Sequence, residues 1–285
     1  MTDSGTLYLV GTPIGNLGDI SDRARDTLAA VDVVAAEDTR RTGRLLARFG
    51  IRARTMSLFE GNERARTVEV LALLRRGLDV AVVSDAGMPG LSDPGFRLVR
   101  ACAEEGIDVR VVPGPSAAVA ALVVSGLPSD RFSFEGFLPR RVGERRARLM
   151  ALVSDPRTLG MFESPRRVRG TLRDIVEALG DRRVALAREL TKLHEEVIRG
   201  RASDVLQELE RREPRGEVVV VVEGAPERPP GDRPAAVAEA ESLVTAGLKP
   251  RAAAAEVARR HGIPANDVYR SLVRNRQVRS RTTSR

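Results

Sequence analysis

The stretch DVAVVSDAGMPGLSDPG, residues 79–95, is the clearest indication of the fold class. It begins with a short apolar run, which is typical of a strand buried on both faces of a parallel sheet. The run ends in a loop that is denser in glycine and proline than a simple turn requires. Because ligands bind beyond the carboxyl ends of the strands in an open parallel sheet, this strand and its loop predict an α/β domain with a ligand site at one sheet edge.

Apolar runs of the same kind recur on both sides of that stretch and alternate with segments of helical period. They are LYLVG (7–11), DVVAAED (32–38), TMSLF (55–59) and DVRVVPG (108–114). The alternation predicts a parallel sheet with crossover helices. Asp93 followed by Pro94, and Pro115 followed by Ser116, are helix start signals, and Gly126 is a stop signal for the second of these helices.

The segment from Leu127 to Arg141 interrupts this rhythm with two prolines and three phenylalanines, and we interpret it as a domain hinge. Four further strand-like runs follow: TLGMFES (158–164), RVALARE (183–189), EEVIRG (195–200) and EVVVVVEGA (217–225). Several of them are joined by connections too short for a helical crossover. The second sheet should therefore be mixed or largely antiparallel.

A linker is predicted at residues 227–234, ERPPGDRP, because this composition sustains neither a helix nor strand pairing, and three short helices follow it. We therefore expect an α/β protein in three parts. They are a parallel-sheet domain (1–126), a mixed-sheet α/β domain that completes a cofactor cleft (127–226) and a basic, helix-turn-helix-like helical module (234–285).

The composition favours a metal-independent protein with an anionic partner. The 285 residues include 47 Lys and Arg against 39 Asp and Glu, a formal charge of +8, which suits a polyanion. The single cysteine, Cys102, excludes an internal disulfide, and His194 and His261 are too few for a metal cluster. Neither a secretory signal nor a membrane-spanning apolar run is found, so we expect a cytoplasmic location.

Seven motifs together resemble one protein family. They are VGTPIGNLGDI (10–20), AEDTRRTGRLL (36–46), SDAGMPGLSDPG (84–95), VPGPSA (112–117), FEGFLPRR (134–141), FESPRR (162–167) and LTKLHEE (190–196). The chain resembles, over essentially its whole length, the ribosomal RNA small-subunit methyltransferase I family within the tetrapyrrole methylases. The resemblance implies S-adenosylmethionine in a cleft between two α/β domains, and a homodimer. It also implies 2′-O-methylation of the decoding-region cytidine of 16S ribosomal RNA that is usually numbered 1402.

The same resemblance implies a set of cofactor-binding residues, which are Pro13, Ser84, Asp85, Ala86, Gly87, Ser116, Ala117, Phe162 and Ala225. Gly114, in the VPGPSA loop, is expected to allow the backbone to approach the ligand closely. A helix that begins at Ser116 would favour the methionyl carboxylate. Two interpretations of Asp85 stay open: a contact to the sulfonium, and a loop-capping aspartate that bonds its own backbone.

Methyl transfer to a ribose hydroxyl needs alignment above all, and a nearby base or cation would help. We interpret Asp38, in the AEDTRR motif, and Glu163, at the end of a strand, as active-site acids, and Lys192 as a third catalytic candidate. The alternatives in the same motifs are Glu37, His194, Glu195 and Glu196. For His194 a solvated strand edge is the preferred interpretation.

Three arginine pairs, each in a loop or at a helix start, are predicted to hold RNA phosphates: Arg40 and Arg41, Arg140 and Arg141, Arg166 and Arg167. The last pair lies in a first helical turn, where it opposes the helix dipole unless an external anion is bound there. Aromatic residues make up only 3% of the chain, which indicates recognition of RNA shape more than base stacking.

The stretch from Val268 to Arg285 contains six arginines and no acid. Its apolar positions, Val268 and Leu272, should pack on the helix that carries Val257 and Ala258. We predict that this module is an auxiliary contact to the small ribosomal subunit, and a merely solvated terminus is the open alternative.

Two other functions stay open at this point. A related enzyme could methylate a precorrin or uroporphyrinogen ring, but the AEDTR and FESPRR motifs and the helical module argue against it. A non-enzymatic nucleic-acid-binding protein could use its last helices as a helix-turn-helix. That alternative leaves the ligand-type loops at three strand ends unexplained.

Overall fold

The computed structural model of the chain describes residues 4–212, 214–226 and 233–282. Contacts divide the chain into two compact units, residues 1–225 and 226–285, and each unit is described by itself. Most of the predicted linker, residues 227–232, lies outside the described residues.

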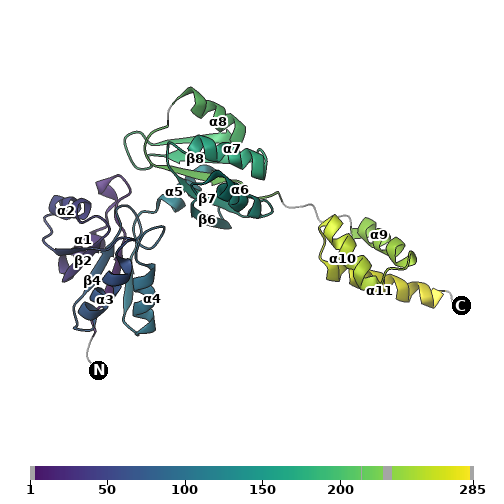
Figure 1. The fold of residues 1–285 in the computed structure, drawn as a ribbon, viewed down its shortest axis with the longest axis horizontal. Coiled ribbons are helices and arrows are strands. Elements are labelled where there is room, and N and C mark those ends of the chain that lie inside the picture. Colours follow the sequence, from purple (N-terminus) through teal and green to yellow (C-terminus); the bar gives the residue numbers. More distant parts are fainter. Residues whose placement is uncertain (1–3, 213, 227–232, 283–285) are drawn as a thin grey trace. The chain divides into compact units, whose positions relative to one another are not determined.

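The larger unit begins with a sheet of five short parallel strands in the order β3-β2-β4-β1-β5 (Figure 1). The strands are β1 (Leu7–Val10), β2 (Val33–Ala36), β3 (Arg54–Ser57), β4 (Val80–Val83) and β5 (Val109–Val112). All their pairings are parallel, which confirms the predicted sheet. Strand β4, from the stretch that opens the sequence analysis, is central and buried along its whole length.

Helices cover both faces of this sheet because alternate residues of a strand point to opposite sides. Ala81 and Val83 face α1 (Asp22–Ala30) and α2 (Thr39–Arg48). Val80 and Val82 face α3 (Glu63–Leu74) and α4 (Phe96–Glu104). A single 3₁₀ turn, η1 (Leu17–Asp19), precedes α1.

The helix start predicted at Asp93 and Pro94 is wrong. Helix α4 begins at Phe96, with Gly95 as its N-cap at a φ of 130°. Asp93 is therefore part of the loop and not of a helix cap.

The second sheet has the order β6-β7-β10-β8-β9 and is mixed, as predicted. Its strands are β6 (Phe132–Phe137), β7 (Thr158–Glu163), β8 (Arg183–Arg188), β9 (Glu196–Arg201) and β10 (Val218–Val222). Only β6 and β7 pair in parallel. The segment interpreted as a hinge thus contains an edge strand, whose irregular register between Phe134 and Phe137 obscures the usual alternation.

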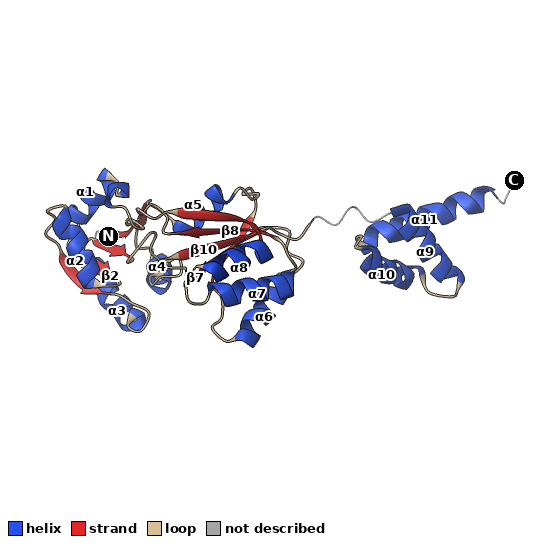
Figure 2. Ribbon diagram, turned by 90° about the horizontal axis from the view of Figure 1, so that it is seen from above, coloured by secondary structure: helices blue, strands red, loops and turns tan. Residues whose placement is uncertain are grey.

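The five valines of β10 are buried on both faces of this sheet. Val218, Val220 and Val222 belong to the core formed with α6 (Val142–Ala151), α7 (Val168–Leu179) and α8 (Ala202–Arg211). Figure 2 shows these three helices together beside the second sheet. Val219 and Val221 face α5 (Ala117–Ser125) on the other side.

Helix α5 ends at Gly126 in the left-handed conformation, as predicted, but it packs on the second sheet. The predicted division after Gly126 had placed this helix in the first domain. The helix instead crosses from the end of β5 to the second sheet, which puts its first residues, Ser116 and Ala117, among the loops at the sheet edge.

The smaller unit consists of α9 (Arg233–Thr245), α10 (Pro250–His261) and α11 (Ala265–Thr282). Val268 and Leu272 of α11 are buried together with Val257 and Ala258 of α10, as predicted. The side chains of Arg270 and Arg274 on α11 are exposed. Within the described part of the chain, no helix has the length and apolar content needed to cross a membrane.

Candidate functional site

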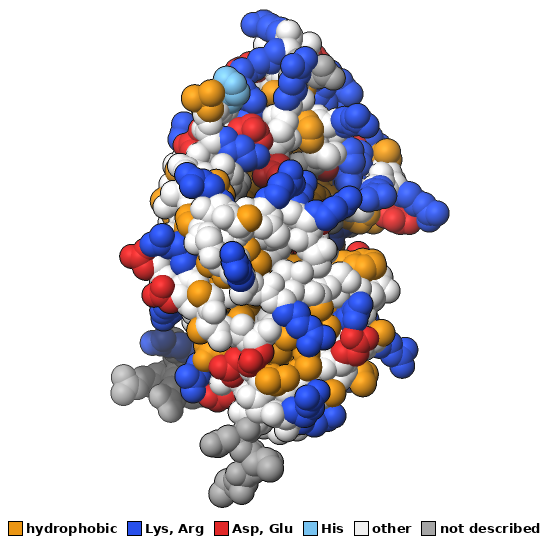
Figure 3. Space-filling view, turned by 90° about the vertical axis from the view of Figure 1, so that its left-hand side faces the viewer, with side chains coloured by type: hydrophobic (Ala, Val, Ile, Leu, Met, Phe, Trp, Pro, Cys, Tyr) orange, Lys and Arg blue, Asp and Glu red, His pale blue; other side chains and the backbone are white. Residues whose placement is uncertain are grey.

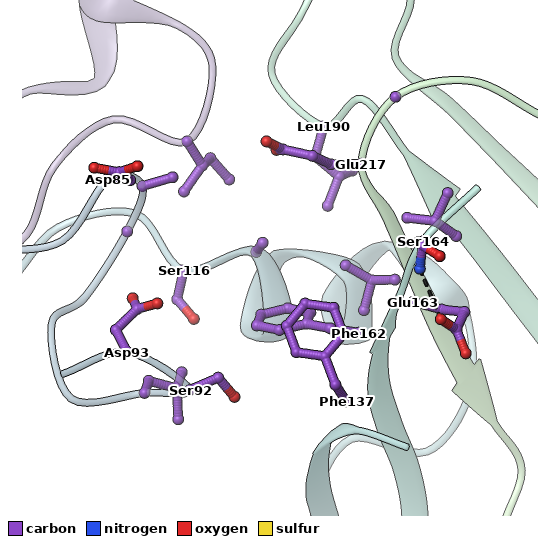
Figure 4. Close-up of a pocket in the computed structure, with 18 of the residues that line it drawn as sticks. Asp85, Ser92, Asp93, Ser116, Phe137, Phe162, Glu163, Ser164, Leu190 and Glu217 are labelled. Carbon is purple, nitrogen blue, oxygen red and sulfur yellow. Dashed lines mark hydrogen bonds between the residues drawn. The ribbon is translucent and has the colours of Figure 1, made fainter. Parts of the chain in front are cut away.

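A cavity of about 490 Å³ lies where the loops at the carboxyl ends of β1, β2 and β4 and the start of α5 meet the second sheet (Figure 4). We call it the main cavity. The second sheet contributes the ends of β6, β7 and β8 and the beginning of β10. The main cavity is therefore at the edge of the parallel sheet where doubly wound folds bind ligands.

Two of the loops are joined to each other beside this cavity. Thr12 and Gly87 exchange backbone hydrogen bonds of 2.9 and 3.1 Å, and the Thr12 hydroxyl donates to the Ser84 carbonyl oxygen at 3.2 Å. Gly87 has a φ of 87°, which residues with a Cβ rarely adopt. A Cβ on Gly87 would also lie 3.3 Å from the Pro115 carbonyl oxygen. Glycine is thus needed at this position of the cavity wall.

Gly114, by contrast, serves the packing of the loops. A Cβ on Gly114 would lie 2.9 Å from the Cα and carbonyl carbon of Gly11, and Gly114 does not line the cavity. Gly114 therefore lets the two loops pack closely, and it lies outside the lining of both cavities.

The start of α5 offers hydrogen-bond donors to the main cavity. Ser116 is the N-cap of α5, but its hydroxyl makes no capping bond, and its oxygen is buried without a partner. The first amides of a helix also have no partner within the helix and favour an anion. In Figure 4 the Ser116 side chain lies on the same side of the cavity as Asp85 and Asp93. Ser116 and Ala117 both line the cavity, where they were expected.

The opposite wall is apolar. Phe162 lines the cavity and makes an edge contact with Phe134, at a centroid distance of 4.8 Å, and a tilted contact with Phe137 at 5.5 Å. Ala187 and Val219 continue this wall. Such a surface suits the flat face of an aromatic ring.

Ala225 follows the end of β10 and does not line the cavity, although the resemblance implied that it binds the cofactor. Strand β10 is antiparallel to β7, so Val219 pairs with Phe162 and the beginning of β10 lies at the cavity. The backbone N–H of Ala225 donates to the Asp155 carbonyl oxygen, next to the other end of β7. The cavity residues are instead Gly216 and Glu217, which the sequence analysis missed.

Carboxylates line the side formed by the first sheet. The Asp85 carboxylate accepts a hydrogen bond from the Asp38 backbone N–H at 3.0 Å and pairs with Arg41 at 3.2 Å. The Asp85 N–H in turn donates to the Glu37 carboxylate at 3.0 Å. Asp85 thus joins two loops and does not cap its own, which decides against the second of its two interpretations. Among the residues described, no group of His, Cys, Asp and Glu could hold a metal ion.

Asp93 completes this acidic side of the main cavity. Burial, together with the negative charges of Glu37 and Asp85, raises the pKa of Asp93 to about 6. The sequence analysis missed Asp93 as a site residue because its position before a proline resembles a helix cap.

Replacing Asp93 with asparagine should raise the free energy of unfolding at pH 8 by about 1–3 kcal/mol and change it little at pH 4. The pKa of Asp93 is higher in the folded protein than its usual value of 3.8, so its stabilising contribution is lost as the pH rises through about 6. Urea unfolding of the ligand-free protein at the two pH values measures this difference. Asp19→Asn, at an exposed aspartate, is the control, and equal pH profiles for the two variants would contradict the prediction.

Asp38 is not an active-site acid in this structure. It is the N-cap of α2, where its carboxylate accepts a hydrogen bond from the Arg40 N–H at 2.8 Å and pairs with the Arg40 side chain at 3.1 Å. The side-chain hydrogen bond from Arg40 lowers the pKa of Asp38 to about 2. Asp38 and Arg40 therefore stabilise the N-terminus of α2, and neither lines the main cavity.

Glu163 is also structural. Its buried carboxylate accepts hydrogen bonds from the Ser164 N–H at 2.8 Å and the Thr171 hydroxyl at 2.6 Å, and it points away from the cavity in Figure 4. Arg167 lies 3.2 Å from Glu163 and donates to the carbonyl oxygens of Leu138 and Pro139. The anion at this helix start is thus Glu163 itself. Glu163 lines the main cavity, but its carboxylate oxygens are engaged within the protein, and the Arg167 guanidinium is engaged by Glu163 and two carbonyl oxygens rather than free for RNA.

Lys192 lines a neighbouring cavity of about 320 Å³, which we call the second cavity. Its ammonium group donates to Glu189 at 2.8 Å and to Glu217 at 3.2 Å. Burial alone would lower the pKa of Lys192, but the hydrogen bond to Glu189 and the charge of Glu217 outweigh it and raise the pKa.

Pro13 and Ser84, expected at the cofactor, line the second cavity and not the main one.

The predicted RNA-binding arginines differ in position. Arg41 lines both cavities, whereas Arg140, Arg141 and Arg166 are exposed and line neither. Figure 3 shows many blue Lys and Arg side chains on one face of the molecule, with red acidic side chains between them. The distribution of charged side chains therefore does not by itself identify an RNA-binding surface on this face.

The comparisons with known proteins agree with this geometry. The family of tetrapyrrole (corrin/porphyrin) methylases matches residues 6–206. The ribosomal RNA small subunit methyltransferase I of Thermotoga maritima is 52% identical over 221 residues, which are 77% of this chain and 99% of that relative. The protein of the same name from Escherichia coli O157:H7 is 47% identical, over 93% of this chain and 94% of the relative.

A solved structure shows the same fold. It is the uroporphyrin-III C-methyltransferase from Thermus thermophilus, complexed with S-adenosyl homocysteine. It is similar with a TM-score of 0.55 and 21% identity, over 77% of this chain and 97% of that one.

Proposed function

Because the chain belongs to the ribosomal RNA small subunit methyltransferase I family of tetrapyrrole methylases, we propose that it methylates the 2′-hydroxyl of a cytidine in 16S ribosomal RNA. The methyl donor is S-adenosylmethionine. The target that we propose is the decoding-region cytidine usually numbered 1402. The observation that carries the proposal is the main cavity, where donors, carboxylates and an aromatic wall surround one space.

The residues of the main cavity fit S-adenosylmethionine. The unpartnered Ser116 hydroxyl and the start of α5 suit the methionyl carboxylate. Asp85 and Asp93 suit the positive charges of the ammonium and sulfonium groups. Phe162 and Val219 suit the adenine ring, and the volume of about 490 Å³ is in the usual range for ligand sites, roughly 300–1,000 Å³.

The chemistry that the chain must add is mainly alignment. When bound, S-adenosylmethionine supplies a methyl group on a positively charged sulfur, which is already a good leaving group. The ribose oxygen gains the methyl group, the electrons of the broken C–S bond stay on sulfur, and the hydroxyl proton departs. Glu217 lines both cavities with an exposed carboxylate, so it is placed to accept that proton. Holding the reacting atoms in line supplies most of the acceleration.

Label transfer tests the proposed function directly. The purified protein is incubated with methyl-labelled S-adenosylmethionine and with small subunits that lack the modification. We expect label in 16S RNA at one position, where the linkage resists alkali because its 2′-oxygen is blocked. Label that is confined to a base, or transfer to a uroporphyrinogen and not to RNA, would contradict the proposal.

Replacing Gly87 with alanine should weaken the binding of S-adenosylmethionine by about 10-fold, because the new methyl group strains a positive φ and presses on the Pro115 carbonyl oxygen at the cavity wall. Gly90→Ala is the matched control. Gly90 has a similar φ of 82°, but a Cβ there meets nothing within 4 Å and the residue does not line the cavity. Calorimetry gives both affinities, and equal losses in the two variants would place the cofactor elsewhere.

We also propose a homodimer. Strand β5 is an edge of the first sheet, and Val111 on it and Val119 and Val123 on the following helix are exposed apolar residues. Sedimentation equilibrium measures the mass, and a monomer at micromolar concentration would overturn this part of the proposal.

A further inference from the structure

The second cavity adjoins the main cavity. Five residues line both of them: Ile14, Arg41, Asp85, Ala86 and Glu217. The remaining wall of the second cavity comes from the loop after β1, the first turns of α2, Ser84 and Lys192. A group bound in the second cavity would thus meet a ligand of the main cavity at these shared residues.

The two cavities differ in charge. Arg41 is the only Lys or Arg that lines the main cavity, which is also lined by the carboxylates of Glu37, Asp85, Asp93, Glu163 and Glu217. The second cavity is lined by Arg41, Arg44 and Lys192 against Asp85 and Glu217. The main cavity therefore suits a cationic ligand, and the second suits an anionic one.

Arg44 is the cation of the second cavity that is free to bind an external anion. Arg41 is paired with Asp85, and Lys192 is held between Glu189 and Glu217. Arg44 is exposed on α2 and forms no ion pair within the described part of the chain. A guanidinium group with no partner in the protein can donate two parallel hydrogen bonds to two oxygens of a phosphate.

Lys192 is held in place by unusual backbone geometry. Glu189 and Thr191 have positive φ angles of 50° and 66°, although neither is glycine. The Lys192 side chain packs on Gly15, where a Cβ would lie 2.5 Å from its Cγ. A strained loop and a glycine opposite it thus fix the ammonium group beside Glu217, at the boundary of the two cavities.

We propose that the second cavity is the subsite for the target nucleotide of the RNA. Arg44 binds its phosphate, and Lys192 and Glu217 lie at its ribose hydroxyl, next to the methyl donor in the main cavity. The inference rests on the proposed function, because it assigns the acceptor of that same reaction. It explains why basic residues and the LTKLHEE motif meet the loop after β1 at this point.

The test replaces Arg44 with glutamine and uses Arg48→Gln as the matched control. Arg48 is also exposed and lies one turn further along α2, but it lines neither cavity. We measure the affinity of each full-length variant for small subunits without cofactor, over a range of salt concentrations, and its affinity for S-adenosylmethionine.

Arg44→Gln should weaken subunit binding about 10-fold and reduce its salt dependence by about one phosphate contact. Its affinity for S-adenosylmethionine should stay within about twofold of the wild type, and Arg48→Gln should match the wild type in every measurement. Unchanged subunit binding and salt dependence in Arg44→Gln would overturn the subsite. If the wild type still methylates a ribose in that case, the proposed function stands, whereas a wild type without ribose methylation refutes the function itself.

Discussion

Replacing Lys192 with methionine should slow methyl transfer to small subunits by about 100- to 1,000-fold, the usual effect of removing a positioned donor from developing negative charge. The ammonium group lies 2.8 Å from Glu189 and 3.2 Å from Glu217, at the boundary between the two cavities. There it would stabilise the charge that grows on the ribose oxygen. Methionine keeps the apolar stem that packs on Gly15, so the fold should be preserved.

Single-turnover rates with saturating subunits measure this effect, and calorimetry should show nearly unchanged cofactor affinity. Lys192→Arg is the conservative variant and should recover part of the rate, because it restores a cation beside Glu217. If the methionine variant transfers methyl groups at the wild-type rate, Lys192 only supports the loop and has no part in the reaction.

Removing residues 226–285 should leave a folded protein with normal affinity for S-adenosylmethionine, but raise the KM for small subunits by roughly 10- to 100-fold at near-physiological salt. The larger unit has its own cores on both sheets, and the smaller unit has a separate core around Val257 and Leu272. The Thermotoga maritima relative matches over 221 residues, close to the length of the larger unit. The lost part contains the six arginines from Val268 onward.

A second variant that keeps the module but replaces the exposed Arg270 and Arg274 with glutamine separates charge from bulk. It should show part of the same rise in KM, and less of it at high salt. The truncated protein ends at Ala225 because the larger unit ends there. Full-rate methylation by the truncated protein at all salt concentrations would mean that the module is dispensable and its charge incidental.

Most helices and strands could be predicted from the pattern of residues, although β6 was interpreted as a hinge and the start of α4 was misplaced. Runs such as VAVV and VVVVV could be predicted as buried strands because they are short, rich in valine and followed by turn residues. The family resemblance implied Gly87, Ser116 and Phe162 as cofactor-binding residues, and each lines the main cavity. Local backbone conformation and the alternation of buried positions depend on residues that are close in the sequence, so the pattern of residue types can predict them.

Which of the chemically suitable residues lie together depends on contacts between distant parts of the chain. Strand β10 is antiparallel to β7, which brings Glu217 to the cavity and removes Ala225, although both flank the same run of valines. Glu163 and Asp38 carry the right functional group, but their oxygens are engaged by Thr171, Ser164 and Arg40. Asp93 belongs to the loop that lines the cavity, and not to a helix cap, because α4 begins only at Phe96. Strand direction and hydrogen-bond partners are long-range properties, so no local pattern of residue types could specify them.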